Sequence, residues 1–321
     1  MSKIPIIIDC DPGVDDSYAI ALANSYSGFT IKALTPVAGN VAAELTRRNA
    51  LALAEMLNID CRVAFGAKQP LYKAYHTAEV GVHGVSGVGT VVFPPTKKAA
   101  DALPAWDVIY QEAKAAAGRL ILFATGPLTN IALTLRKYPD LPRYLAKFCI
   151  MGGGTFGNQP ASQLRAEFNI WTDPSAAKEV FEKLEVYMVP LDATHQAALS
   201  SSDFQQMIAL CGDSEALYLL RELSLFSHYN SIVKGYDNDI IHDALAIAAL
   251  INPEVVSFTD HYVYVGQEGT ADEGVTVIDL DNSSGKPANC HVALNCNQPL
   301  FATMMKNMCR YYRQKAQATI T

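Results

Sequence analysis

The amino-acid sequence predicts an α/β fold, with an open, mostly parallel sheet, a Rossmann-like core and helices on both faces. Two observations predict it. Short apolar runs of strand length alternate with helical patterns up to about residue 190, as expected where crossover helices connect parallel strands. The chain also has enough apolar residues for a large core, since 50% of its 321 residues are hydrophobic and only 18% are charged.

The strand and helix patterns follow one another in chain order. Apolar runs predict strands at 4–11, 30–39, 61–66, 119–125, 147–154 and 186–192. Helical patterns predict the helices that follow or separate them at 15–25, 45–56, 104–117, 128–137 and 174–183. The C-terminal third carries additional helices at about 202–210, 214–233, 243–251 and 298–314, and strands at 262–266, 275–280 and 290–295. No low-complexity linker or internal repeat interrupts this order, so we expect a single domain over residues 1–321.

The composition narrows the class of protein. The chain has 25 Lys and Arg against 32 Asp and Glu, a formal net charge of −7, which disfavours general binding to nucleic-acid phosphates. Its first residues lack the apolar core and cleavage site of a secretory signal, and no apolar stretch suits a membrane span. The seven cysteines are scattered and form no CxxC pair or disulfide framework. We expect a cytoplasmic protein with no nucleic-acid or membrane partner.

The densest group of reactive side chains is the segment DCDPGVDD at 9–16. Its four carboxylates follow a buried strand and begin a helix, and their mutual repulsion would raise their pKa values unless a cation lay among them. Oxygen donors at this density suit Ca²⁺ or Mg²⁺. Strand alternation puts Asp9 and Asp11 on one side, so one is expected to orient and the other to act. Helix capping by Asp15 and Asp16 is the alternative, but it uses only one or two of the four acids.

Further polar clusters stand where predicted strands end. In open α/β sheets the ligand crevice lies outside the carboxyl ends of the strands, so we expect these clusters to border the acidic segment. They are AGN at 38–40, ATGPLTN at 124–130, MGGG at 151–154 and LDATH at 191–195. AEFNI at 166–170 lies in a loop, and HDALA at 242–246 begins an apolar helix, where Asp243 is alternatively an ordinary N-terminal helix residue. The long stretches 66–100 and 152–170 are expected to be functional loops.

Together these motifs resemble the nucleoside hydrolases, the inosine-uridine preferring nucleoside hydrolase family. The family's N-terminal signature, Asp-x-Asp-Pro-Gly-x-Asp-Asp, is intact at 9–16. AGN, ATGPLTNIA, MGG, AEFNI and HDALA follow in the family's order, and the matches extend to about residue 250. Six matches in one order exclude chance.

The resemblance implies a Ca²⁺-dependent ribonucleoside hydrolase that releases ribose and a free nucleobase in nucleoside salvage. It makes Asp11 the general base that holds a metal-bound water for attack on the anomeric carbon, and His242 the group that protonates the departing base. The implied Ca²⁺ ligands are Asp11, Asp16, Asp243 and the backbone carbonyl of Thr125. The implied ribose contacts are Asp15, Asn40, Met151, Glu167 and Asn169.

The residue types suit this chemistry independently of the family resemblance. N-glycosidic cleavage passes through an oxocarbenium-like ribosyl cation, which carboxylates on its underside stabilise. A polar cradle for three hydroxyls selects ribose, because a missing hydroxyl leaves a buried partner unpaired. A histidine titrates in the range that assists a leaving base. No basic phosphate cradle accompanies the acids, so water is the expected nucleophile.

One loop departs from the family's pattern. Many members carry an asparagine that contacts the ribose about six residues before the glutamate. Ala161 stands in that place here, and the nearest candidate is Asn158, nine residues before Glu167. A longer loop can still deliver this side chain, so Asn158 is the expected ribose contact.

The base pocket rests on a histidine and two tyrosines. His83 lies in a segment that resembles the family's His-Gly-x-x-Gly flap, although it is alternatively a plain loop histidine. Tyr229 and Tyr236 precede His242 and could reach a nucleobase, although aromatics at helical spacing more often belong to the core. The two histidines favour uridine and inosine-type substrates, with a pyrimidine preference, over the purine-specific branch that relies on tryptophan stacking. Family members are commonly dimers or tetramers, which implies a homodimer or homotetramer.

Two other functions stay open from the sequence. A haloacid-dehalogenase-like phosphatase also begins with a strand and Asp-x-Asp, but Pro12-Gly13-Val14 replaces its usual small residue and threonine, and no late pair of acids is evident. A non-catalytic Ca²⁺-containing nucleoside- or ribose-binding protein would leave its ligand intact. A nucleotide-binding oxidoreductase is poorly supported, because the glycines at 84–89 follow no strand.

Overall fold

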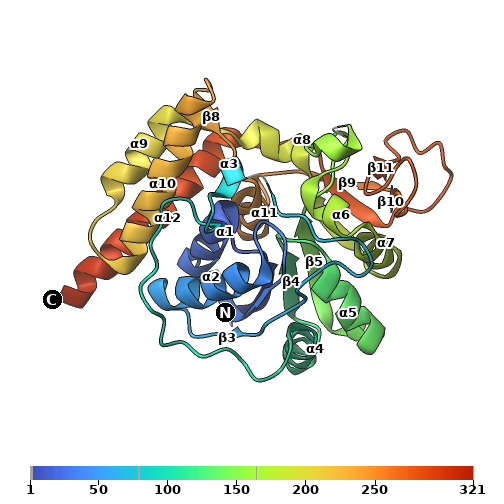
Figure 1. The fold of residues 1–321 in the computed structure, drawn as a ribbon, viewed down its shortest axis with the longest axis horizontal. Coiled ribbons are helices and arrows are strands. Elements are labelled where there is room, and N and C mark those ends of the chain that lie inside the picture. The colour runs from blue at the N-terminus through green and yellow to red at the C-terminus, as the bar shows by residue number, and fades with distance from the viewer. Residues whose placement is uncertain (1–2, 79, 164, 321) are drawn as a thin grey trace.

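One eight-stranded sheet, in the order β3-β2-β1-β4-β5-β6-β12-β9, organises the fold (Figure 1). The computed structural model describes residues 3–78, 80–163 and 165–320. The strands are β1 (Ile4–Cys10), β2 (Phe29–Pro36), β3 (Arg62–Val63), β4 (Leu120–Ala124), β5 (Leu145–Met151), β6 (Val186–Val189), β9 (Phe258–His261) and β12 (Cys290–Ala293). All neighbouring pairs are parallel except β12 and β9. Its first six strands have the Rossmann order, which places the topological switch point between β1 and β4 and confirms the predicted fold class.

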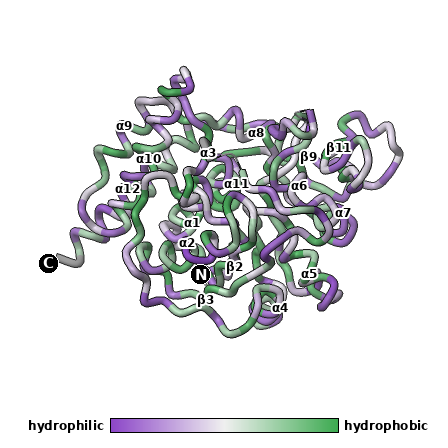
Figure 2. The backbone as a smooth tube through the Cα atoms, in the orientation of Figure 1, coloured by the Kyte–Doolittle hydropathy of each residue, from purple (hydrophilic) through white to green (hydrophobic). Residues whose placement is uncertain are grey.

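Helices cover both faces of this sheet because strand side chains alternate between two hydrophobic cores. On β1, Ile6 and Ile8 belong to one core and Ile7 to the other. Helices α1 (Val14–Ser25), α2 (Ala43–Met56), α11 (His242–Ile251) and α12 (Gln298–Ile320) pack on the first core, and α4 (Ala105–Ala116), α5 (Thr129–Lys137) and α7 (Pro174–Lys183) on the second. Figure 2 shows this arrangement as hydrophobic residues gathered in the central elements and more hydrophilic ones toward the periphery.

The C-terminal third adds a helical layer and a small sheet. Helices α9 (Ser201–Leu210) and α10 (Glu215–Val233) pack against each other and against α12 (Figure 1). The predicted strands at 262–266 and 275–280 form β10 (Val263–Val265) and β11 (Thr276–Ile278), which pair as a separate antiparallel sheet. Within the described residues, no helix is long and apolar enough to span a bilayer.

Three expectations for these elements were wrong in detail. The predicted strand at 61–66 is reduced to β3, although the N–H groups of Ala64 and Gly66 still donate to the carbonyls of Leu34 and Pro36 on β2. Strand β9 was missed, since its residues are intermediate or exposed and show no apolar run. The last helix continues to Ile320 rather than ending at 314.

Short elements in loops bring side chains to the carboxyl edge of the sheet. Helix α3 (Val80–His83) lies in the loop at 66–100, and α6 (Phe168–Thr172) follows the loop after β5. Helix α8 (Leu191–Thr194) follows β6, and the short strands β7 (Leu199–Ser200) and β8 (Asn238–Asp239) pair just before α11. Of these segments, α3 and α6 contribute residues to the cavity described next.

Candidate active site

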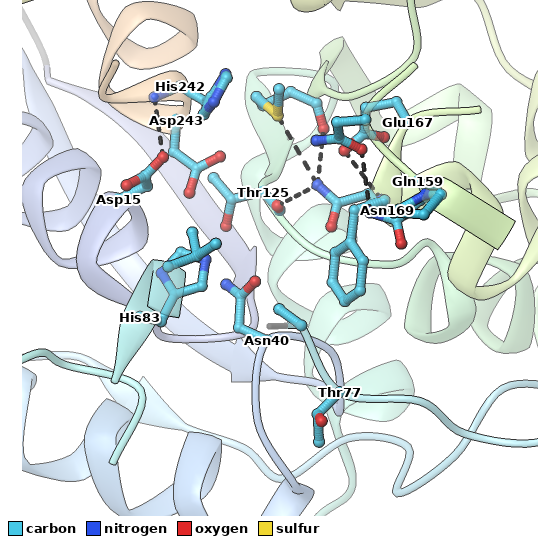
Figure 3. A pocket seen from close by; sticks show the side chains of 16 residues that line it. Asp15, Asn40, Thr77, His83, Thr125, Gln159, Glu167, Asn169, His242 and Asp243 are labelled. Atoms are coloured by element: carbon cyan, nitrogen blue, oxygen red, sulfur yellow. Dashed lines mark hydrogen bonds between the residues drawn. The ribbon is translucent and has the colours of Figure 1, made fainter. Parts of the chain in front are cut away.

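A cavity of about 240 Å³ opens at the carboxyl ends of β1, β4 and β5, beside the switch point (Figure 3). Both long loops contribute to its wall, as the sequence predicts. Its lining includes ten of the predicted site residues: Asp15, Asn40, His83, Thr125, Met151, Asn158, Glu167, Asn169, His242 and Asp243. Residues that the sequence did not single out also line it: Thr77, Ala78, Val82, Gln159, Pro160 and Phe168.

Asp16 connects the acidic segment behind this cavity. Its Oδ2 accepts hydrogen bonds from the backbone N–H of Gly13 (2.9 Å) and from Asn40 Nδ2 (3.2 Å). Its Oδ1 accepts from the backbone N–H of Asp11 (3.2 Å) and from Thr125 Oγ1 (2.6 Å). Asp16 is fully buried, so these bonds join the start of α1 to the ends of β1 and β4. This is more than the helix capping considered as the alternative.

Asp11 is held through one carboxylate oxygen while the other stays unpaired. The backbone N–H of Asn40 donates to Asp11 Oδ2 at 2.7 Å, whereas the buried Oδ1 has no hydrogen-bond partner among the described residues. A Cβ added at Gly39 would lie 2.0 Å from Oδ2, and one at Gly126 would lie 2.7 Å from Oδ1. Two glycines therefore let the backbone close on both sides of this carboxylate.

Asp9 lies on the same side of β1 as Asp11, but its side chain belongs to a different hydrogen-bond network. Its Oδ2 accepts from Thr35 Oγ1 (2.6 Å) and Asn130 Nδ2 (2.8 Å). Its backbone carbonyl accepts from the N–H of Thr125 at 2.8 Å. Asp9 is fully buried and does not line the cavity, so it ties β1 to β2, β4 and α5. The partners Thr35 and Asn130 were not predicted, although Asn130 stands in a motif that the sequence singled out.

The opposite wall is built on the loop after β5. Glu167 caps α6, accepting backbone N–H bonds from Asn169 (3.0 Å), Gly153 (3.1 Å) and Ile170 (3.2 Å). Asn169 Nδ2 donates to the carbonyls of Thr125 (2.7 Å) and Met151 (3.3 Å). These bonds fix an acid and an amide side by side at the cavity (Figure 3).

The third wall joins α1 to α11. Asp15 Oδ2 accepts the backbone N–H of His242 at 3.0 Å, which sets the first turn of α11 beside the first turn of α1. Asp243, the next residue, is 4% exposed and accepts no hydrogen bond from any described residue. Figure 3 shows its carboxylate turned toward the space that Thr125 and Asn169 also face.

The acids of the site are buried together, and the described residues provide no ion-pair partner for Asp11, Glu167 or Asp243. Burial, followed by repulsion from other carboxylates, raises the pKa values of Asp11 and Asp243 well above their usual range. Burial likewise raises the pKa of Glu167 to about 7, against the backbone N–H bonds that lower it. No ion pair between described residues includes these three acids. Such a cluster stabilises a positive charge placed beside it.

This donor set suits a hard divalent cation in its chemistry. It offers carboxylate oxygens, the Thr125 carbonyl and the unpaired Asp11 Oδ1, all of the oxygen type that such ions prefer. Among the described residues, however, no three His, Cys, Asp or Glu side chains are arranged to hold an ion as they stand. Both oxygens of Asp16 are engaged in hydrogen bonds, so coordination by Asp16 requires its side chain to exchange partners.

Two histidines line the cavity beside these acids. Burial, with smaller contributions from His195 and His83, lowers the pKa of His242 to about 3. Burial also lowers the pKa of His83 to about 4, with Lys234 contributing. The backbone N–H of Val14 donates to His83 Nδ1 at 3.3 Å, which leaves the ring proton on Nε2.

The two predicted tyrosines lie outside the cavity wall. Tyr229, on α10, is 66% exposed, and Tyr236, just beyond that helix, is 65% exposed. They are therefore not core residues, which was the alternative reading of their spacing. Their contact with a base stays a prediction. Asn158, by contrast, lines the cavity despite the altered loop length.

Acids gathered beneath a polar cavity, without an ion-pair partner among the described residues, suit an enzyme that stabilises a sugar cation, as a glycosidase does. The comparison with known families makes this specific. The chain belongs to the inosine-uridine preferring nucleoside hydrolase family, whose model matches residues 6–303.

Relatives in sequence agree with this membership. The chain is 39% identical over 299 residues to the non-specific ribonucleoside hydrolase RihC of Escherichia coli O127:H6, covering 92% of this chain and 94% of that protein. It is 39% identical over 297 residues to the RihC of Klebsiella pneumoniae, with 91% and 94% of the two chains covered.

Solved structures agree as well. A plant nucleoside hydrolase superposes with a TM-score of 0.86 at 26% identity, covering 96% of this chain and 99% of that one. A purine-preferring ribonucleoside hydrolase from Gardnerella vaginalis gives 0.84 at 28% identity, with 95% and 99% covered. The chain is thus an N-glycosidase that acts on ribonucleosides, and the phosphatase and non-catalytic readings fall away.

Proposed function

We propose that this enzyme is Ca²⁺-dependent and hydrolyses uridine- and inosine-type ribonucleosides to ribose and free base. The observation that carries the proposal is the unpaired, buried Asp11 Oδ1 among acids that have no ion-pair partner in the described residues, directly behind a polar cavity. A free carboxylate oxygen in that position is available to a water molecule and to a cation.

Asp11 is the proposed general base. The N–H of Asn40 holds its Oδ2, and the backbone at Gly39 and Gly126 prevents the carboxylate from turning away. Its raised pKa makes it a stronger base than an ordinary aspartate. The neighbouring acids favour the oxocarbenium-like sugar that forms as the base departs.

The ribose is the best-defined part of the substrate. Its proposed contacts are Asp15, Asn40, Met151, Asn158, Glu167 and Asn169, all of which line the cavity. Glu167 and Asn169 are already fixed by backbone bonds, so little side-chain entropy is lost when sugar hydroxyls bind them. A deoxyribose would leave one of these buried groups unpaired, which predicts strong selection for ribose.

The proposed Ca²⁺ ligands are Asp11, Asp16, Asp243 and the Thr125 carbonyl. When bound, the ion supplies positive charge that offsets the repulsion among the acids and lowers the pKa of a water beside Asp11. Because Asp16 is occupied by hydrogen bonds, the protein must adjust locally on loading.

The leaving base meets the two histidines. His242 is proposed to supply its proton or hydrogen bond, and His83 to contact the base. Tyr229, on α10, and Tyr236, just beyond that helix, are proposed as further base contacts. The two histidines support uridine and inosine with a pyrimidine preference, and neither Trp106 nor Trp171 lines the cavity for purine stacking. The relatives' names include non-specific and purine-preferring hydrolases. The base preference is therefore the most specific claim of the proposal.

Three broader expectations belong to the same proposal. A single domain over 1–321 is supported by β12, which joins the C-terminal region to the main sheet beside β6. A cytoplasmic location is supported by the seven cysteines, all of which are free thiols. A homodimer or homotetramer is proposed from the family resemblance alone.

The test is release of reducing sugar from uridine, cytidine, inosine, adenosine and guanosine in phosphate-free buffer. Each nucleoside is assayed as prepared, after treatment with EDTA, and after Ca²⁺ or Mg²⁺ is restored. We expect ribose release that EDTA abolishes and Ca²⁺ restores, with uridine or inosine cleaved best. Full activity after exhaustive chelation would overturn the metal dependence, and a purine-only ranking would overturn the base preference.

A further inference from the structure

We propose that Tyr75 is a positioning residue, which fixes the orientation of the peptide that holds the general base Asp11. The inference rests on the proposed role of Asp11 in nucleoside hydrolysis. Tyr75 lies in the long loop at 66–100, is half-buried and does not line the cavity. Its hydroxyl donates to the backbone carbonyl of Gly39 at 3.1 Å, and a carbonyl can only accept. The sequence predicts a functional loop here and singles out AGN at 38–40, but nothing in it pairs Tyr75 with Gly39.

The peptide between Gly39 and Asn40 is held at both of its polar groups. Its N–H, which belongs to Asn40, donates to Asp11 Oδ2 at 2.7 Å. Its carbonyl, which belongs to Gly39, accepts from Tyr75. Because a trans peptide is planar, its N–H and its carbonyl point in opposite directions, and fixing one of them fixes the other. The Asp11 carboxylate and the Tyr75 hydroxyl therefore lie on opposite sides of one peptide and set its orientation together.

The composition of this turn makes the restraint necessary. A Cβ at Gly39 would lie 2.0 Å from Asp11 Oδ2, so the close approach to the carboxylate requires glycine. Glycine also gives the backbone more conformational freedom than another residue would. Among the described residues, Tyr75 is the one hydrogen-bond donor to the Gly39 carbonyl. If this peptide rotated, Asp11 Oδ2 would lose the N–H of Asn40 and would face a carbonyl oxygen instead.

The loop that carries Tyr75 is anchored on either side of it. Before the tyrosine, Lys73 Nζ lies 2.6 Å from the carboxylate of Glu273, near the small sheet. After the tyrosine, the backbone N–H of Ala78 donates to the carbonyl of Asn40 at 3.2 Å. The hydroxyl is thus presented to the turn by a segment that is held at both ends, so a residue outside the cavity can orient a carboxylate behind it.

The first experiment measures the kinetics of Tyr75→Phe, which removes the hydroxyl and keeps the ring. We expect kcat to fall about three- to tenfold, as for the loss of one hydrogen bond, while KM changes less than about twofold. The loss should be the same on the best natural nucleoside and on p-nitrophenyl riboside, because both need an attacking water. Tyr312→Phe is the matched control and should match the wild type, because the Tyr312 hydroxyl donates to the carbonyl of Ala21 at the same 3.1 Å, away from the site.

The second experiment asks whether Tyr75 acts through Asp11. In an Asp11→Asn background the base is already lost, so adding Tyr75→Phe should change the residual kcat by less than about twofold. A residue that only supports the loop would instead cost the same factor with and without Asp11. Equal factors in the two backgrounds would overturn the inference.

The third experiment follows the peptide itself by hydrogen–deuterium exchange of the full enzyme, resolved to the Asn40 amide. Exchange should be about fivefold faster in Tyr75→Phe than in the wild type, and unchanged in Tyr312→Phe. Unchanged exchange or unchanged kcat in Tyr75→Phe would overturn the inference. The Asp11→Asn single variant separates the two claims. If it hydrolyses nucleosides normally, the proposed role of Asp11 fails. If it is slow while Tyr75→Phe is unimpaired, only the role of Tyr75 fails.

Discussion

The two ends of the central sheet each carry a cluster of acids, and their surroundings differ. At the carboxyl ends of β1 and β4, the acids behind the cavity are buried and have no basic partner among the described residues. At the amino ends of β6 and β12, Glu185 and Asp260 are 72% and 68% exposed in their side chains, and they share His291 between them at 2.7 and 2.6 Å.

This difference separates a functional cluster from a structural one. Around His291, the acids and the ring are paired and exposed to water, so these ion pairs contribute little to the free energy of folding. Behind the cavity, burial and mutual repulsion raise the pKa of Asp11. Such an unfavourable arrangement of acids is typical of a functional site, where a ligand supplies the missing positive charge. The number of acids alone does not identify a site; their burial beside a cavity, without an ion-pair partner among the described residues, does.

The largest expected effect comes from Asp11→Asn. We expect kcat/KM to fall about 10³-fold or more, because the proposed base is lost while its shape is kept. Burial raises the pKa of Asp11 above its unfolded value, so its charge opposes folding at neutral pH. The variant should therefore melt at or above the wild-type temperature in EDTA. Asp260→Asn, at the other end of the sheet, should leave turnover unchanged. Near-normal turnover by Asp11→Asn would refute the base assignment.

Gly126→Ala tests the same carboxylate without changing its chemistry. The added Cβ would lie 2.7 Å from Asp11 Oδ1, so the carboxylate must move. A displacement of this size at a reacting group is expected to lower kcat about 10²-fold. Gly212→Ala is the control, because its Cβ would meet only Leu217 Cδ1 at 3.5 Å. If both variants turn over equally well, the tight fit around Asp11 has no catalytic importance.

The sequence predicted the contacts beside the ends of β1 and β2 better than the contacts between elements that are distant in the chain. Asp11 and Asn40 follow β1 and β2, and Asp16 lies in the first turn of α1, so the order of neighbouring elements predicts that they meet. Thr194 Oγ1 lies 2.8 Å from Nδ1 of His242, and the sequence could not predict this contact, since the residues are distant in sequence and it depends on how α8 and α11 pack. The pairing of β9 with β12 was not predicted either, because the residues of β9 have no apolar pattern of their own.

Calcium should stabilise the folded chain through the buried acids. A ligand that binds only the native state at about 100 times its Kd adds about 2.7 kcal/mol to the free energy of unfolding. We expect the Tm of EDTA-stripped wild type to rise on titration with Ca²⁺, and that of Asp243→Asn to rise much less. Asp260→Asn should respond like the wild type. If Ca²⁺ raises the Tm of Asp243→Asn as much as that of the wild type, the ion does not bind at this donor set.

The two exposed tyrosines proposed for the base pocket should have a smaller effect than the acids. If Tyr229 and Tyr236 stack on a bound base, replacing either by Ala should cost about 1 kcal/mol, or roughly fivefold in kcat/KM for nucleosides. Both are largely exposed in the free protein, so the Tm should not change. Tyr264→Ala, at a 47% exposed tyrosine on β10, is the matched control. Equal kinetics in all three variants would exclude the tyrosines from the base pocket.

The smallest effect belongs to His291. Burial lowers its pKa, but the hydrogen bonds to Glu185 and Asp260 outweigh burial and raise the pKa above the ordinary value of 6.5. The charged ring therefore stabilises the fold below that ordinary pKa, and the contribution is lost as the pH rises through the higher folded-state value. Thermal unfolding of wild type and His291→Gln should differ at acidic pH and converge at alkaline pH, by less than about 1 kcal/mol because the partners are exposed. Nucleoside hydrolysis should be the same in both proteins. If the stability difference between the wild type and His291→Gln instead grew with rising pH, His291 would be held neutral. The contrast between the two ends of the sheet would then rest on burial alone.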